Sequence, residues 1–298
     1  MLSFADFTAI LEWSDWESPP EEMRCELPLR DLLGRVLGLL DELSSAAGPP
    51  APGGPAASTA IHSAALRLYL LVPALVNVAL NYKICVEHGL PLHPTVYYEL
   101  KEARKYRISH SLGEIQRASE LYWNAIGVAR ACMRLDPVAG DSLRAYMATL
   151  PPSVLDFIYT SAQDHYTWLG SRPTLLQGLA DKVRKTYEPQ IIVAAAHGSI
   201  MPALILAELL GVPLYFIRFS MFKRRDEEPI LSLSDQAWLF DFRDKNALLY
   251  DEDVAGGRTL ELFLSRLAPL FGQVRTACSI RHAGASIHPD FSGRTWWD

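Results

Sequence analysis

A short acidic and glycine-rich stretch in the C-terminal half has the residue types of a site for a phosphorylated sugar. Asp251 and Glu252 are adjacent carboxylates, which can accept from two neighbouring hydroxyl groups or hold a hydrated Mg²⁺. Gly256 and Gly257 allow the backbone to turn its N–H groups toward one point, and Thr259 adds a hydroxyl where a helix would begin. Amide groups at a helix start favour anions. The alternative interpretation is an ordinary strand, turn and helix with an acidic cap.

A second loop, Ala196-His197-Gly198-Ser199, has the same character. Gly198 lets the backbone come close to an anion, and Ser199 stands at a predicted helix N-terminus, where anions are favoured. His197 either contacts the ligand or is a surface histidine in a turn. We expect ligand contact from the loop context.

Alternating strands and helices are predicted to position both loops. The apolar pattern predicts strands at residues 191–196, 212–218, 247–250 and 274–281, helices at 199–210 and 259–271, and a weak strand or loop at 235–241. Strands and helices in this order are typical of a parallel sheet flanked by helices. Ligands of such sheets bind at the carboxyl ends of the strands, which is where both loops fall.

The stretch ALLYDEDVAGGRTL, residues 247–260, resembles the phosphoribosyl-diphosphate (PRPP) binding motif of type I phosphoribosyltransferases. In that family four apolar residues precede two acidic ones, and a loop of small residues ends in Gly-x-Thr. The resemblance implies that Asp251 and Glu252 are catalytic, grip the ribose hydroxyls and hold Mg²⁺. It implies that the 5-phosphate is bound by the loop, which comprises Ala255, Gly256, Gly257, Arg258 and Thr259.

Residues 191–218 look like the family's first strand, diphosphate loop, helix and second strand. The resemblance implies diphosphate binding by Ala196, His197, Gly198 and Ser199, and a catalytic contact from Arg218. Residues 222–236 match the place of the family's flexible catalytic loop, so Lys223 is a candidate to neutralise the leaving diphosphate, along with Arg224 and Arg225. The alternative for these three residues is a solvated run of charge.

The segment Arg281–Gly293 resembles the hood of the family's 6-oxopurine branch. Carried over by position, Arg281 would donate to the base carbonyl, Phe291 would stack on the base and Ser292 would read the base edge through its backbone. Trp296 and Trp297 are alternatives for the hydrophobic lid, and aromatic residues near a terminus also often serve to dock it.

One position departs from the family pattern. Ala255 stands where 6-oxopurine enzymes carry a carboxylate as general base, and loss of a general base typically costs about 10²–10⁴ in rate. We expect transfer of the 5-phosphoribosyl group from PRPP to a nitrogenous, purine-like acceptor, with release of diphosphate. The alternative is a non-catalytic regulatory protein of the same fold that senses PRPP or a nucleotide. A partner-binding protein with a vestigial pocket is disfavoured by the intact acidic pair.

The N-terminal half resembles no family. Helical patterns predict an all-helical domain over residues 1–150, with a Pro/Gly/Ala-rich loop at 46–57, before the phosphoribosyltransferase-like α/β domain at 151–298. It would pack on the sheet, cover the acceptor pocket or form a dimer interface. His110 and Glu114 are four residues apart but lack further ligands at matching spacing, so no metal is expected there. The apolar stretch at 68–82 is too interrupted for a membrane span and predicts a buried helix.

Composition narrows the class of protein. The 298 residues include 28 Lys and Arg against 34 Asp and Glu, and the formal net charge of −6 argues against non-specific nucleic-acid binding. The four cysteines are widely spaced and form no CxxC pair, which indicates reduced thiols in the cytoplasm. The acidic N-terminus does not look like a signal peptide. We therefore expect a cytoplasmic protein without nucleic-acid or membrane partners, and the family resemblance implies a homodimer.

Overall fold

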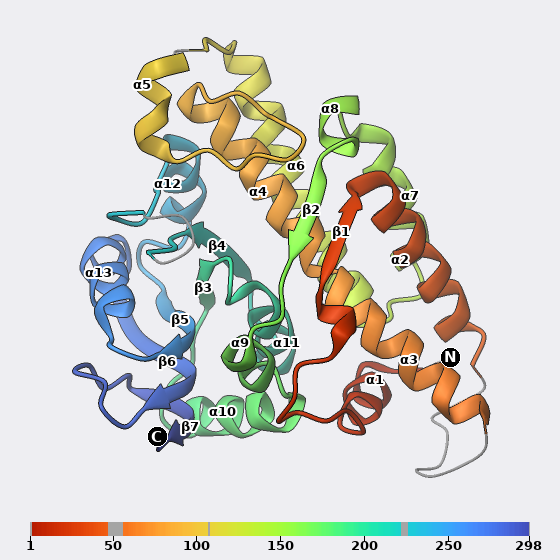
Figure 1. Ribbon diagram of the computed structural model, residues 1–298. Coiled ribbons are helices and arrows are strands. Elements are labelled where there is room, and N and C mark those ends of the chain that lie inside the picture. Colours follow the sequence, from red (N-terminus) through yellow and green to blue (C-terminus); the bar gives the residue numbers. More distant parts are fainter. Residues whose placement is uncertain (1, 47–55, 107, 222–225, 298) are drawn as a thin grey trace. The chain divides into compact units, whose positions relative to one another are not determined.

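The computed structural model describes residues 2–46, 56–106, 108–221 and 226–297, and the chain divides into two compact units (Figure 1). The first unit is Met1–Gln163 and the second is Asp164–Asp298. Lys223, Arg224 and Arg225, as well as most of the predicted Pro/Gly/Ala-rich loop, lie outside the described residues.

The N-terminal unit is mostly helical. Its elements are α1 (Phe4–Leu11), η1 (Glu21–Met23), β1 (Cys25–Pro28), α2 (Leu29–Ser44), α3 (Ala56–Leu71), α4 (Pro73–His88), η2 (Leu100–Glu102), α5 (Ala103–Tyr106), α6 (Leu112–Met133), α7 (Ala139–Thr149), α8 (Pro152–Leu155) and β2 (Ile158–Ser161). The sequence did not predict the antiparallel pair of β1 and β2, whose strands are far apart along the chain. Pairing of this kind is decided by tertiary contacts, which local patterns do not carry.

Residues 95–134 have a helical sequence pattern throughout, but a long helix forms only in their second part. The long helix α6 begins only at Leu112, where the Ser111 side chain accepts from the Glu114 amide and the Glu114 carboxylate accepts from the Ser111 amide. This capping box satisfies amide groups at a helix start and fixes the boundary. The preceding segment contains only the short elements η2 and α5 within its described residues.

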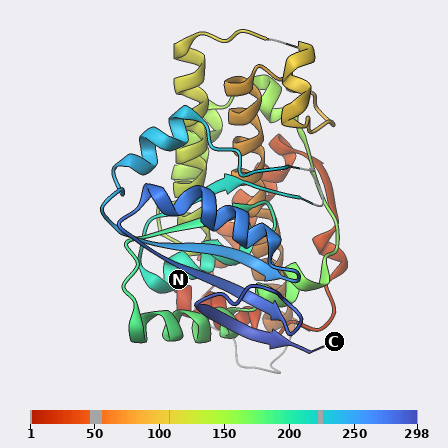
Figure 2. The ribbon, with the colours of Figure 1, turned by 90° about the vertical axis from the view of Figure 1, so that its left-hand side faces the viewer.

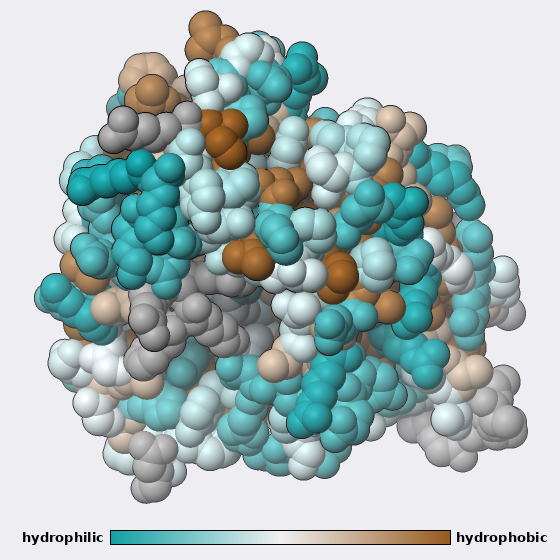
Figure 3. Space-filling view, turned by 45° about the horizontal axis from the view of Figure 1, so that its top comes forward, coloured by the Kyte–Doolittle hydropathy of each residue, from teal (hydrophilic) through white to brown (hydrophobic). Residues whose placement is uncertain are grey.

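The apolar helices α3 and α4 form the core of this unit. Between Thr59 and His88 the most apolar stretch has a mean hydropathy of 1.7, and 72% of it is buried in the structure. Its length and composition alone would suffice to cross a membrane, but the core helix of a globular unit has the same character. On the face shown in Figure 3, apolar residues are scattered among hydrophilic ones. The structure thus agrees with the predicted buried helix.

The C-terminal unit is an α/β domain. Its elements are α9 (His165–Gly170), α10 (Pro173–Thr186), β3 (Ile191–Ala196), α11 (Ile200–Leu210), β4 (Leu214–Arg218), α12 (Leu233–Phe240), β5 (Asn246–Val254), α13 (Arg258–Leu267), η3 (Ala268–Leu270), β6 (Gln273–His282) and β7 (Phe291–Trp296). The five strands are parallel in the order β4-β3-β5-β6-β7. Helices α10 and α11 pack together on the sheet, and α13 packs on β5 (Figure 2). The predicted fold class, a helix-flanked parallel sheet after a helical region, is confirmed.

Three predictions within this unit need correction. Residues 235–240 belong to helix α12 rather than to a weak strand or loop, because Ser232 and Asp235 form a capping box that starts the helix. The sequence also predicted β6 as the last strand, whereas β7 pairs beside it. Strand β5 is longer than predicted and includes Asp251, Glu252 and Asp253.

Candidate active site

A pocket of about 470 Å³ opens at the carboxyl ends of β3 and β5. It is lined by Asp164, Tyr166, Thr167, Ala195, His197, Gly198, Phe219, Ser220, Met221 and residues 251–260. Both predicted loops therefore open into one space. Parallel pairing of β3 with β5 causes this, because it aligns the ends of the two strands.

The acidic pair is tied to the loop after β3 by Ser199. The Ser199 Oγ donates to Glu252 Oε2 at 2.7 Å and accepts from the Glu252 amide at 3.1 Å. It also lies 3.4 Å from Asp251 Oδ1. Ser199 is completely buried and does not cap α11 through its side chain, so its hydroxyl positions the acidic pair.

Asp251 is buried at the floor of the pocket. The pKa of Asp251 is raised well above its usual value. Burial is the largest cause, and the charge of Glu252 is the next. Asp253 adds repulsion of the same sign. Three successive carboxylates thus make this part of the pocket strongly attractive to cations.

Gly198 is required by the close approach of Glu252. A Cβ atom placed on Gly198 would lie 1.5 Å from Glu252 Oε1, which no real structure tolerates. The neighbouring His197 lines the pocket as predicted, and the peptide bond between Ala196 and His197 is cis. Ala196 itself is fully buried, and Ala195 rather than Ala196 reaches the pocket wall.

The loop between β5 and α13 has the geometry of an anion site. Gly257 has a φ of +91°, a conformation that favours glycine, and its carbonyl accepts from the Glu261 amide as α13 begins. The amides of Arg258 and Thr259 stand in the first helical turn, where helix geometry supplies no intrahelical acceptor. The Thr259 Oγ1 donates to the Met221 sulfur at 3.7 Å. All five predicted loop residues line the pocket, so the amides can receive a phosphate.

Arg218 does not reach the pocket. Its guanidinium is paired with Asp226, with Nη2 at 2.9 Å from Oδ1 and Nε at 3.3 Å from Oδ2. The side chain is 1% exposed. The position is therefore structural in this conformation, and a diphosphate contact would require the pair to separate.

The three residues predicted from the C-terminal segment are not brought to the pocket. Phe291 begins β7 and lies beside the ring of Tyr187 at 6.3 Å. Ser292 is in the same strand, and its carbonyl accepts from Lys182 Nζ. Arg281 pairs with Thr295 in the sheet and contacts His288 through its guanidinium. The register of β7 against β6 explains their positions. Thr295 is the residue of β7 that pairs with Arg281, so Phe291 lies four residues back from that end of the sheet.

The sequence missed an aromatic group at the pocket. Tyr166 of α9 lines the pocket, with its ring 4.7 Å from His282 and 6.0 Å from Trp296. Trp296 ends β7, so it lies near the carboxyl ends of the strands. The sequence noted Trp296 as an alternative for the lid, but nothing local indicated that α9 would bring Tyr166 beside it.

The sequence also missed a contact between Asp253 and His282. His282 Nε2 lies 2.9 Å from Asp253 Oδ1, because the two residues end the adjacent strands β5 and β6. Burial raises the pKa of Asp253 to about 6, although His282 acts in the opposite direction. The sequence did contain one signal for this position. Side chains alternate along a strand, so Asp253 points to the same side of β5 as Asp251.

The comparisons with known proteins match the C-terminal part of the chain. The family model of the phosphoribosyl transferase domain matches residues 172–295. Among solved structures, a purine phosphoribosyltransferase from Pyrococcus horikoshii is 26% identical, with 42% of this chain and 84% of that chain covered and a TM-score of 0.35. A Neisseria gonorrhoeae protein with bound ppGpp is 25% identical, covering 42% and 79%, with a TM-score of 0.37. No curated protein matches the chain. The C-terminal part of the chain, residues 172–295, thus matches a phosphoribosyl transferase domain, as the resemblance of its motifs implied.

Proposed function

We propose that the C-terminal unit transfers the 5-phosphoribosyl group of PRPP to a nitrogenous acceptor and releases diphosphate. One observation carries the proposal: the acidic pair, the glycine loop and the loop after β3 line a single pocket of about 470 Å³. This is the set of groups that a sugar bearing a phosphate at one end and a diphosphate at the other needs. The match of residues 172–295 to the phosphoribosyl transferase domain supports the same reaction.

Each part of PRPP has a partner of matching chemistry. The first-turn amides of α13 and the Thr259 hydroxyl would hold the 5-phosphate. Asp251 and Glu252 would accept from the ribose hydroxyls. The backbone at Gly198, with His197, would face the diphosphate, since both residues line the pocket.

Mg²⁺ fits the donor set of this pocket. Mg²⁺ sites with phosphorylated substrates commonly use one or two carboxylates and take the remaining oxygens from the substrate and water. Asp251 and Glu252 would be these carboxylates; burial, and after it the charge of Glu252, raises the pKa of Asp251, and a bound cation would offset that charge repulsion. When bound, Mg²⁺ would supply positive charge to the diphosphate oxygens.

Catalysis would rest on positioning and on charge. As the bond from C1 of the ribose to the diphosphate breaks, the sugar becomes cation-like and negative charge grows on the leaving group. The Asp251 and Glu252 carboxylates, which line the pocket, would stabilise the growing positive charge, and the amides of the two loops would hold the phosphate groups in place. Such a reaction depends less on a general base than proton abstraction does, which accommodates Ala255.

The acceptor would stack on the aromatic group formed by Tyr166 and Trp296. A flat nitrogenous ring gains about 1–3 kcal/mol from such stacking. Tyr166 supports this assignment better than Phe291, because Tyr166 lines the pocket. A purine-like acceptor remains our proposal for the ring system.

Calorimetry and diphosphate release test the proposal. PRPP titrated into the full chain with Mg²⁺ should release heat, and a panel of purine and pyrimidine bases should show which one triggers diphosphate release. Asp251→Asn combined with Glu252→Gln should abolish turnover while the protein stays folded. Asp241→Asn combined with Asp244→Asn changes the same charge at exposed residues of the same unit, and should keep full activity. Retained turnover in the first variant would remove the ribose-site assignment.

Ala255 favours a second candidate, a non-catalytic sensor of PRPP or a nucleotide. This residue lines the pocket at the place of the family's general base and can neither accept nor donate a proton. If PRPP binds with a measurable heat but no base of the panel triggers diphosphate release, the result would support the sensor over the enzyme.

A further inference from the structure

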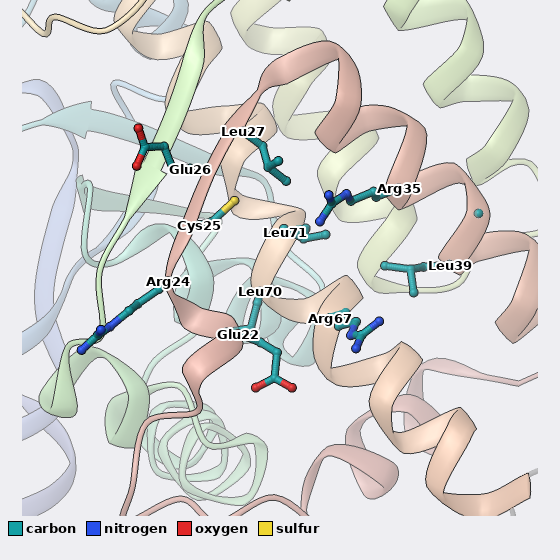
Figure 4. Close-up of a pocket in the computed structure, with 11 residues that line it drawn as sticks. Glu22, Arg24, Cys25, Glu26, Leu27, Arg35, Leu39, Arg67, Leu70 and Leu71 are labelled. Atoms are coloured by element: carbon teal, nitrogen blue, oxygen red, sulfur yellow. The ribbon is translucent and has the colours of Figure 1, made fainter.

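The helical unit contains a pocket larger than the one at the sheet. It measures about 590 Å³ and lies between β1, α2 and α3 (Figure 4). Its apolar wall consists of Leu27, Leu39, Leu70 and Leu71. Its volume is in the range of pockets that bind small molecules, about 300–1,000 Å³.

Two arginines face this apolar wall from opposite helices. Arg35 extends from α2 and Arg67 from α3, and both guanidinium groups lie at the space between the helices (Figure 4). Neither forms an ion pair with a described residue of the chain. Arginine at such a position is suited to bind a carboxylate or phosphate through two parallel hydrogen bonds.

The nearby acidic side chains do not neutralise these arginines. Side chains alternate along β1, so Cys25 and Leu27 face the pocket while Glu26 points to the other side of the strand (Figure 4). Glu22 and Glu26 both line the pocket, but among the described residues neither forms an ion pair with Arg35 or Arg67. Arg24, which points away from both arginines, lies 4.0 Å from Glu21. The lining residues include three arginines, Arg24, Arg35 and Arg67, against the two carboxylates, so the net formal charge of the pocket is positive.

Cys25 gives independent evidence for the polarity of the pocket. Its thiol is half-buried, and burial raises its pKa, while the charge of Arg35 acts against that increase. The guanidinium of Arg35 is thus close enough to act on groups inside the pocket. Of the four cysteines, the other three are buried, so Cys25 is a specific reporter for this site.

We propose that this pocket binds a small amphipathic anion, with its carboxylate or phosphate on Arg35 and Arg67 and its apolar body against the four leucines. The apolar wall fits the apolar body of such a ligand, and the two arginines fit its anionic group. A purely apolar molecule leaves the arginines without an anion, and a bare anion leaves the leucines exposed to water. The proposal is independent of phosphoribosyl transfer, since every lining residue belongs to the helical unit.

The test uses four probes on the full chain. Octanoate and octyl phosphate combine an anion with an apolar chain, 1-octanol has the chain alone, and inorganic phosphate has the charge alone. Binding is measured by calorimetry and by the rate at which iodoacetamide alkylates Cys25, followed by mass spectrometry. At least one of the two amphipathic anions should bind and slow the alkylation, and should bind at least about tenfold more tightly than octanol or phosphate. The tighter of the two identifies the head group.

Variants assign the binding to this pocket. Arg35→Ala combined with Arg67→Ala should weaken the amphipathic anion at least about tenfold. Leu39→Ser should weaken it through the apolar wall. Arg117→Ala, an exposed arginine of α6, is the matched control and should change nothing. The proposal is overturned if neither anion binds at millimolar concentration, if octanol binds equally well, or if the double arginine variant keeps its affinity.

Discussion

The guanidinium of Arg218 and the carboxylate of Asp226 form an ion pair in which the two side chains are 1% and 2% exposed. Asp226 Oδ2 also accepts from the Ser220 amide at 3.0 Å. The pair therefore joins the end of β4 to the segment that follows it. The Arg218 charge is therefore used to stabilise this connection within the protein and is not available to a ligand in this conformation.

Removing Asp226 should strongly destabilise the protein. Asp226→Ala leaves the Arg218 charge buried without its carboxylate, which typically costs about 3–5 kcal/mol. The free energy of unfolding from a urea titration measures this. Asp181→Asn, which breaks an exposed ion pair with Arg184, should cost less than about 1 kcal/mol. Equal small losses in both variants would mean that Arg218 is not held by Asp226 in solution.

Gly198→Ala should impair binding of PRPP. The new methyl group would occupy the place of Glu252 Oε1, so the carboxylate has to leave its bond with Ser199. We expect PRPP affinity to fall at least about tenfold, since a charged hydrogen-bond partner is displaced. Calorimetry with Mg²⁺ and PRPP measures the loss. Gly178→Ala is the control, because a Cβ at Gly178 meets nothing within 4 Å. Unchanged PRPP affinity in Gly198→Ala would show that the position of Glu252 is unimportant for binding.

Ala255→Asp should raise activity on 6-oxopurines. It restores a carboxylate at the pocket position where the resembling enzymes carry a general base, and such a base contributes about 10²–10⁴ in rate. Diphosphate release with hypoxanthine and guanine is the measurement. Ala255→Asn, which has nearly the same shape but accepts no proton, should give no gain. If the Asp and Asn variants behave alike, the missing base does not limit the reaction.

The sequence predicted the parts of the site that are local in the chain. The apolar run 191–196 forms β3 with the predicted bounds, and the motif at 247–260 carries its own strand, loop and helix start. Such segments contain both the apolar pattern and the turn residues that define them.

The sequence failed where pairing between distant segments decides the position. Whether Phe291 reaches the pocket depends on the register of β7 against β6, and no local pattern encodes that register. The partner of Arg218 is a carboxylate eight residues further along the chain, and the position of Tyr166 depends on the packing of α9 against β5 and β6.

Asp253 should make the stability of the domain depend on pH. Burial raises the pKa of this carboxyl to about 6 in the folded protein, from its ordinary value of 3.8. The folded state therefore binds more protons than the unfolded state between about pH 4 and pH 6, and this contribution to stability is lost as the pH rises through that range. Asp253→Asn removes the ionisable group. At pH 7 without Mg²⁺ the variant should be more stable than wild type by about 1–3 kcal/mol, and the difference should vanish toward pH 4.

A second carboxyl provides a control of opposite sign. Hydrogen bonds from Thr276 and Arg275 outweigh burial and lower the pKa of Asp290. Its contribution is present at neutral pH and is lost as the pH falls through its folded pKa, so Asp290→Asn should be less stable than wild type at pH 7. Urea titrations from pH 4 to pH 8 in EDTA compare the three proteins. If Asp253→Asn is no more stable than wild type at pH 7, burial does not raise the pKa of Asp253 in solution as we infer.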